Sequence, residues 1–207
     1  MAGAADSRLP GALAAAVVAA LAVSWCFAFE RGTWVLETAP VFIALALLAA
    51  TRARFPLTPL LYWLIAAHAL VLIYGGTYTY ALTPFGDWLE QALGLSRNPY
   101  DRIGHFMQGF VPAMVAREIL IRRAVVNGAG WRNFLIVCVC LAISATYEFV
   151  EWWAALALGQ GADAFLGTQG DVWDTQWDML MATVGAASAL VLLGCRHDRQ
   201  LAALGVK

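Results

Sequence analysis

The chain has 207 residues, of which 61% are hydrophobic and only 13% are charged, and its formal net charge is −1. A soluble domain of average composition carries about 25% charged residues. The composition therefore excludes an ordinary soluble domain, and the sequence shows no basic patch that would bind nucleic acid.

Six apolar stretches are long enough to cross a hydrocarbon core of about 30 Å. They cover residues 11–29, 33–50, 59–81, 101–121, 133–158 and 172–194. The fourth is the least hydrophobic, and its assignment as a helix depends on its place between clear neighbours. No segment between the spans is long enough for a separate soluble domain. We expect an all-α, multi-pass membrane bundle of about six helices that forms one domain over residues 1–207.

The positively charged residues predict the orientation. With both termini in the cytoplasm, ten of the thirteen lie inside, and the three outside are Arg31, Arg97 and Arg102. A bias of this size over short loops indicates cytoplasmic termini. The segment 84–98 then lies outside. Its apolar residues are spaced three and four apart, which predicts a short helix in the outer membrane interface.

Acidic residues and one histidine gather at the outer ends of three spans. The fourth span begins with Asp101 and His105, the fifth approaches its outer end with Glu148 and Glu151, and the sixth begins with Asp171, Asp174 and Asp178. Glu37, near the outer start of the second span, lies at the same level. Ionisable groups within a span are costly, so their default interpretation is a functional site.

Helical phase groups these residues into three stripes, each about 60° wide at 100° per residue. The stripes are Asp101, His105 and Gln108; Ser144, Glu148 and Glu151; and Asp171, Asp174 and Asp178. Polar stripes on apolar helices should face the bundle interior, which predicts one acidic pocket that opens outward. We expect His105, Glu148, Glu151, Asp174 and Asp178 to form its centre, with Asp101, Gln108, Ser144 and Asp171 behind them.

Three functions fit such a pocket. Carboxylates with a histidine suit a divalent cation such as Zn, Mn, Mg or Ca. Such an ion could neutralise and polarise a polar lipid or an envelope precursor, with Glu148 and Asp178 as candidate catalytic residues. The same acids could instead serve a proton- or cation-coupled transporter, although no polar track continues to the cytoplasmic side. The third function is non-catalytic, either a binding site for a polar ligand or a structural network in which Asp101, Asp171 or Asp174 caps a helix.

Cation binding is the leading hypothesis, and the sequence leaves open whether the protein is an enzyme. The lipid bilayer is the expected environment of the whole chain. Oligomerisation is a further expectation, because Gly185-x-x-x-Ala189 permits close helix packing either within the chain or between protomers.

Three motifs resemble the YjdF-like family of inner-membrane proteins. They are YDRIGHF at residues 100–106, EFVEW at residues 148–152 and FLGTQGDVWDTQWDM at residues 165–179. The resemblance covers nearly the whole chain and implies a multi-pass bacterial inner-membrane protein, but it assigns no reaction.

A fainter similarity is to the VanZ-like membrane proteins, which are linked to glycopeptide-antibiotic resistance. Asp101 and His105 match the first motif of that family, Glu148 the second, and Asp178 with Gly185 the third. The chain departs from the pattern where Glu151 replaces Gln and Ala182 replaces Asn. The similarity implies a shared bundle and an outward pocket, and these departures weigh against a shared ligand.

Overall fold

The computed structural model describes residues 3–159 and 163–205, and within these ranges it contains helices and no strand. The helices are α1 (Gly3–Phe27), α2 (Arg31–Thr51), α3 (Pro59–Thr77), α4 (Pro84–Leu93), α5 (Tyr100–Arg122), α6 (Ala129–Leu158), α7 (Asp163–Leu166) and α8 (Asp174–Ala203). Among the described residues, α1, α2, α3, α6 and α8 are long and apolar enough to cross a membrane. The predicted all-α, multi-pass fold is confirmed.

The remaining long helix, α5, is the predicted fourth span. Its 23 residues extend about 35 Å at 1.5 Å per residue, which is enough to cross the bilayer. It is more polar than its neighbours, and it packs against α3, α6 and α8. A helix enclosed by other helices can carry polar residues that a lipid-facing helix cannot.

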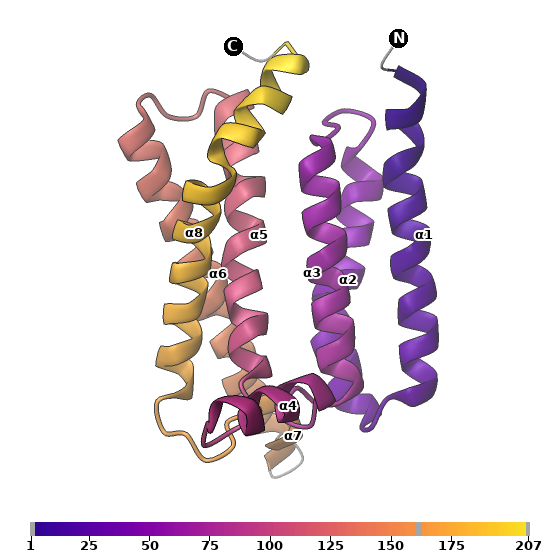
Figure 1. Ribbon diagram of the computed structural model, residues 1–207, viewed down its shortest axis with the longest axis vertical. Helices are drawn as coiled ribbons and strands as arrows, with labels where there is room; N and C mark the ends of the chain where they lie inside the picture. Colours follow the sequence, from indigo (N-terminus) through magenta and orange to yellow (C-terminus); the bar gives the residue numbers. More distant parts are fainter. Residues whose placement is uncertain (1–2, 160–162, 206–207) are drawn as a thin grey trace.

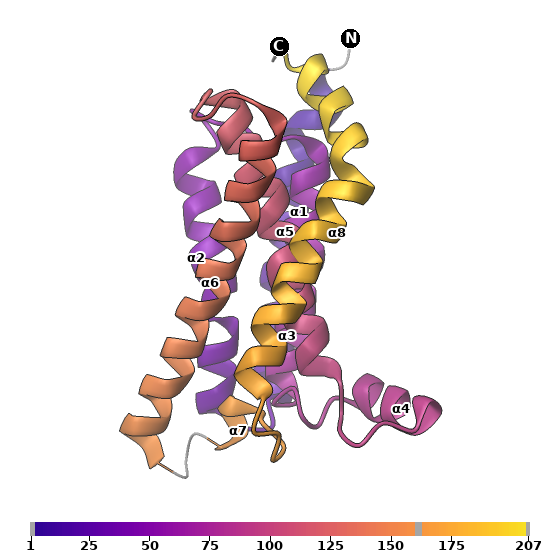
Figure 2. The same cartoon turned by 90° about the vertical axis from the view of Figure 1, so that its left-hand side faces the viewer.

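The long helices form two groups of three that lie side by side (Figure 1). One group is α1, α2 and α3, and the other is α5, α6 and α8, with contacts between α3 and α5 joining them. α1 begins and α8 finishes at the same end of the bundle, while α4 and α7 lie at the opposite end. Figure 2 shows α4 projecting sideways from that opposite end. We call it the α4 end, and the other the terminal end.

Several helix boundaries differ from the predicted ones. α1 begins at Gly3 and ends at Phe27, whereas the first span was predicted over residues 11–29, and α6 begins at Ala129, four residues before the predicted start of the fifth span. The third span was predicted to reach residue 81, but α3 ends at Thr77, because Thr79 and Tyr80 turn the chain with φ of 56° and 50°. The last span was predicted over residues 172–194, whereas α8 runs from Asp174 to Ala203. Hydropathy falls after residue 194 because the sequence becomes polar, but the backbone remains helical.

The short helix predicted in the segment 84–98 is present as α4. It begins with Pro84, whose fixed φ suits the first turn of a helix, and it ends at Leu93, followed by Gly94 with a φ of 63°. The side chains of Phe85, Trp88 and Leu93 are exposed. Its place in the membrane interface stays a prediction.

Glycines allow α5 and α8 to approach closely. A Cβ on Gly109 would lie 1.8 Å from the carbonyl oxygen of Ala182, and a Cβ on Gly185 would lie 2.0 Å from that of Phe106. Both contacts are with backbone, so neither can be relieved by a side-chain rotation. Ala189 is fully buried on the same side of α8. The Gly185-x-x-x-Ala189 motif thus packs helices within the chain.

An apolar layer fills the middle of the α5, α6 and α8 group. It includes Ala113 and Met114 of α5, Ile136 of α6 and Ala186 of α8, all of which are fully buried. Polar residues gather above and below this layer.

Candidate functional site

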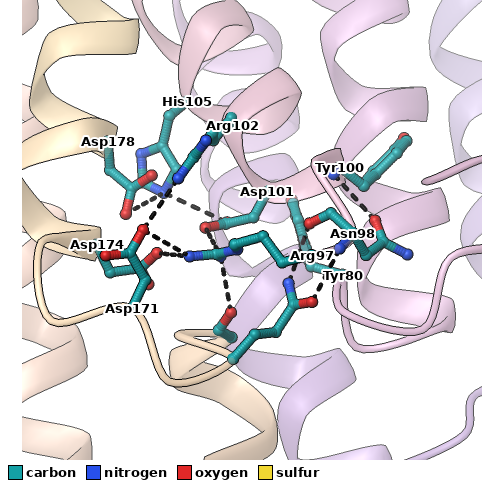
Figure 3. Close-up of polar contacts among 12 residues, drawn as sticks. Tyr80, Arg97, Asn98, Tyr100, Asp101, Arg102, His105, Asp171, Asp174 and Asp178 are labelled. Carbon is teal, nitrogen blue, oxygen red and sulfur yellow. Dashed lines mark hydrogen bonds and ion pairs between the residues drawn. The ribbon is translucent and has the colours of Figure 1, made fainter. Parts of the chain in front are cut away.

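The segment between α4 and α5 is hydrogen-bonded to the segment before α8. The backbone N–H of Asn98 donates to Gln169 Oε1 at 3.0 Å, and Gln169 Nε2 donates to the carbonyl oxygen of Asn98 at 3.0 Å (Figure 3). The Asn98 side chain accepts from the N–H of Tyr100 at 3.0 Å and donates to Asp87 of α4 at 2.8 Å. Asn98 therefore holds the N–H of the first residue of α5, whose N-cap position is Pro99 rather than the Asp101 that the sequence suggested.

Two arginines lie among the acids. Arg97 is buried and pairs with Asp174, with Asp171 at 3.5 Å and with Asp101 at 3.8 Å. Arg102 pairs with Asp171 at 3.0 Å, and its guanidinium lies 4.8 Å from the centre of the Trp177 ring. Figure 3 shows both guanidinium groups directed toward the acids that precede and begin α8.

His105 lies one helical turn after Asp101 on α5. Its Nε2 is 3.5 Å from Asp101 Oδ1 and 3.8 Å from Asp178 Oδ2, while its Nδ1 is 3.0 Å from Gln108 Oε1. Because an amide oxygen only accepts, Nδ1 carries the proton in this contact. In the neutral ring, the lone pair of Nε2 is then directed toward the two aspartates.

The acids of α6 approach His105 from another side. Ligand atoms of His105, Glu148 and Glu151 all lie within 4.8 Å of one another, as do those of Asp101, His105 and Asp178. Glu148 is 7% exposed and Asp178 is 1% exposed. Glu148 Oε1 and Asp178 Oδ1 have no hydrogen-bond partner among the described residues. We call these five residues the His105 cluster: Asp101, His105, Glu148, Glu151 and Asp178.

α2 contributes Glu37, which accepts a hydrogen bond from the Tyr147 hydroxyl at 3.1 Å. The ring of Tyr147 lies edge-on to that of His105, with 6.3 Å between ring centres. Tyr80, in the turn after α3, is also buried nearby. Burial raises the pKa of Tyr80 well above its usual value, and the negative charge of Glu37 raises it further. The Tyr80 hydroxyl is therefore neutral.

The predicted site residues thus divide into three groups. His105, Glu148, Glu151, Asp178 and Asp101 converge in the His105 cluster, with Gln108 bonded to the imidazole. Asp171 and Asp174 are instead paired with Arg97 and Arg102. The third group is Ser144, whose buried hydroxyl has no partner among the described residues. The cluster itself is packed inside the bundle, and a shallow apolar hollow lies on the α6 face lined by Val139, Ala142, Ile143, Thr146, Tyr147 and Val150. An open acidic pocket stays a prediction.

Sequence reasoning did not anticipate that Arg97 and Arg102 would contact the acids, because it counted them only as outer charges. Their spacing was a usable signal, since Arg97 precedes Asp101 by four residues and Arg102 follows it directly. With these two cations satisfied by Asp171 and Asp174, the excess of negative charge lies in the His105 cluster.

A second ionic group was also missed, at the terminal end. Glu118 accepts from the Thr58 hydroxyl at 2.8 Å, from Arg122 at 2.8 Å and from His197 Nε2 at 2.9 Å. Arg117 donates to His197 Nδ1 at 2.9 Å. Since arginine cannot accept a hydrogen bond, His197 is the neutral tautomer with its proton on Nε2. We call Thr58, Arg117, Glu118, Arg122 and His197 the Glu118 cluster.

The fold and these two clusters define a multi-pass helical membrane protein with a buried carboxylate and histidine site near one end. Residues 9–199 match the family described as predicted membrane protein (DUF2238), and the chain belongs to that family. It is 58% identical to the inner membrane protein YjdF of Escherichia coli (strain K12) over 179 residues, which are 86% of each chain. No solved structure matches. The predicted relationship to YjdF-like proteins is confirmed, and the chain is an inner-membrane protein.

Proposed function

We propose that this protein binds a divalent cation at His105, from the outer face of the bacterial inner membrane, with both termini in the cytoplasm. One observation carries the proposal. Asp101, His105 and Asp178 present ligand atoms within 4.8 Å of one another, and all three residues are buried. Buried carboxylates without a compensating charge are costly, and a cation bound between Asp101, His105 and Asp178 would supply that charge.

The geometry around His105 suits a metal ion. Ligand bonds of about 2.1 Å to Nε2 and to oxygens 3.5 Å and 3.8 Å away subtend about 113° and 130° at the ion, of which the first is near the tetrahedral angle and the second is wider. Metal-bound histidines commonly donate their other ring N–H to an oxygen, as His105 does to Gln108. The mixture of imidazole and carboxylate favours Zn or Mn over Mg or Ca, which prefer oxygen alone.

A bound cation would give the site a chemical use. It would attract the phosphate of a polar lipid or an envelope precursor and polarise it toward attack by water. Glu148 is the candidate base, because its Oε1 is buried and unpaired beside His105. Asp178 is the second candidate. This extension depends on cation binding and makes the protein a hydrolase only if turnover is observed.

One observation favours a second function, a proton- or cation-coupled transporter. The Glu118 cluster places buried ionisable groups near the terminal end, so polar sites lie on both sides of the apolar layer. Transport would require the layer around Met114 to open. Cysteines placed there should then react with aqueous thiol reagents in some condition, and complete protection in every condition would exclude transport.

The test of cation binding is metal content measured by mass spectrometry on protein purified in lipid nanodiscs without chelator. The wild type should carry near-stoichiometric metal, and a His105→Ala, Asp178→Ala double variant should carry none. A Glu90→Gln variant is the matched control, because this α4 carboxylate lies outside the cluster, and it should retain the metal. A folded wild type that stays metal-free after incubation with Zn, Mn, Mg and Ca would overturn the proposal in favour of proton-linked transport, a polar ligand or a structural network.

A further inference from the structure

We infer that the His105 cluster holds two divalent cations, with the second ion bound by Glu148 and Glu151. This inference rests on the proposed function, because it adds an ion to the one assigned to Asp101, His105 and Asp178. It also defines the ligand more closely, since a pair of ions suits a phosphate group with two oxygens to coordinate.

The cluster contains two sets of ligands that meet at one histidine. Asp101, His105 and Asp178 form one set from α5 and α8, and His105, Glu148 and Glu151 form the other from α5 and α6. The His105 Nδ1 is engaged by Gln108, so only Nε2 is free for a metal. The single lone pair of Nε2 can bind only one ion. The ion that Nε2 does not bind therefore needs a carboxylate that it shares with the first ion.

The unpaired carboxylate oxygens can form such a bridge between the two ions. Each set contains one deeply buried carboxylate oxygen without a partner among the described residues, namely Asp178 Oδ1 in the first and Glu148 Oε1 in the second. Asp178 Oδ2 is the oxygen that faces His105 Nε2, at 3.8 Å. Its Oδ1 is therefore available for a different ion. A carboxylate that binds one ion through each oxygen is a common bridge between metals.

The number of acidic side chains around His105 also favours two ions over one. Five carboxylates gather around His105, on Glu37, Asp101, Glu148, Glu151 and Asp178, and Arg97 pairs mainly with Asp174 and lies 3.8 Å from Asp101. With all five carboxylates ionised, one divalent cation would leave three negative charges in a buried site, and two would leave one. Buried charge without a partner is strongly unfavourable. The remaining charge is stabilised by the hydrogen bond that Tyr147 donates to Glu37.

The spacing of the ligands fits a pair of ions within a helix bundle. Dinuclear carboxylate centres in bundles take acidic and histidine ligands from facing helices, often three residues apart on one helix. Here Glu148 and Glu151 are three apart on α6, while Asp101 and His105 are four apart on α5. Two ions about 3.5–4 Å apart would hold two oxygens of one phosphate or a bridging water.

The test uses Mn²⁺ as the probe. Protein in nanodiscs is stripped with chelator, exchanged into Mn²⁺, freed of excess metal and analysed for Mn²⁺ per chain and by electron paramagnetic resonance. The wild type should hold two ions with an exchange-coupled spectrum. A Glu148→Gln, Glu151→Gln double variant should hold one ion, with the spectrum of isolated Mn²⁺. The Glu90→Gln control should match the wild type.

The outcomes separate the two proposals. One uncoupled ion in the wild type overturns the second site and leaves the proposed function standing, whereas no ion in a folded wild type overturns both. A folded double variant that loses both ions overturns the division into two ligand sets. If the double variant does not fold, Glu151→Gln alone gives the same comparison, because Glu151 is only half-buried. Retention of two coupled ions there overturns the inference.

Discussion

Replacing Gly185 with alanine would test whether the close contact between α5 and α8 sets the geometry of the His105 cluster. The added Cβ would lie 2.0 Å from the carbonyl oxygen of Phe106, whereas ordinary contacts begin at 3.4 Å. The helices would have to part by more than about 1 Å, because the clash is with backbone. Asp178, two turns before Gly185 on α8, would then move away from His105.

The size of the effect follows from two opposing terms. Overpacking against a rigid neighbour costs about 3 kcal/mol, and alanine is favoured over glycine within a helix by about 1 kcal/mol. The net loss of about 2 kcal/mol should lower the thermal midpoint by about 4–8 °C in a chain of this size. Gly194→Ala is the matched control on the same helix, since nothing lies within 4 Å of its added Cβ.

The assay is thermal unfolding in nanodiscs, followed by tryptophan fluorescence, together with the Mn²⁺ affinity of each variant. Gly185→Ala should unfold earlier and bind Mn²⁺ more weakly, whereas Gly194→Ala should unfold about 2–4 °C later with unchanged affinity. Equal midpoints for the two variants would refute the close approach described here. A destabilised Gly185→Ala that binds Mn²⁺ normally would refute the link between this contact and the cluster.

Two further predictions concern charges outside the His105 cluster. Glu118→Gln should lower the free energy of unfolding by about 3–5 kcal/mol, because it leaves Arg122 without its carboxylate and replaces the buried acceptor of Thr58 and His197. Asp198→Asn should cost at most about 1 kcal/mol in the same unfolding assay, because the Asp198 side chain is 59% exposed. The pKa of Glu30 is lowered chiefly by the hydrogen bond from the Thr33 N–H, and its side chain is exposed. Because the pKa of Glu30 is lower in the folded state, its ionised carboxylate stabilises the fold above pH 4.5, and this contribution is lost as the pH falls through the pKa of the folded state. The stability advantage of the wild type over Glu30→Gln should therefore shrink in acid. An advantage that grows in acid would contradict this assignment.

Helical phase explains why part of the site could be predicted. The positions of Asp101, His105 and Gln108 on one stripe follow from 100° per residue, and the structure places them in contact. The same reasoning brought Glu148 and Glu151 to one side of α6. It could not give the rotation of α8 relative to α5, and that rotation decides that Asp178, rather than Asp174, faces His105.

Contacts between segments that are far apart in the chain could not be predicted from the sequence. Arg97 and Asp174 are separated by 77 residues, and their pairing depends on how the loop before α8 folds over the start of α5. The Glu118 cluster was missed for another reason. Arg117 and Arg122 were counted as cytoplasmic charges at the end of a span, which predicts orientation but not that their partners are a buried glutamate and histidine.

The apolar layer between the two clusters also determines where a membrane voltage would fall. The rise from His105 to Arg117 along α5 is about 18 Å at 1.5 Å per residue, and fully buried Ala113 and Met114 lie in between. With water reaching both clusters, as the predicted outward pocket requires at the α4 end, most of the potential, about 2.3 kcal/mol per elementary charge and 100 mV, would drop across this layer. A cation that reaches His105 from the α4 end does not cross it. The affinity for the proposed cation should therefore be almost independent of voltage and equal in energised and de-energised cells.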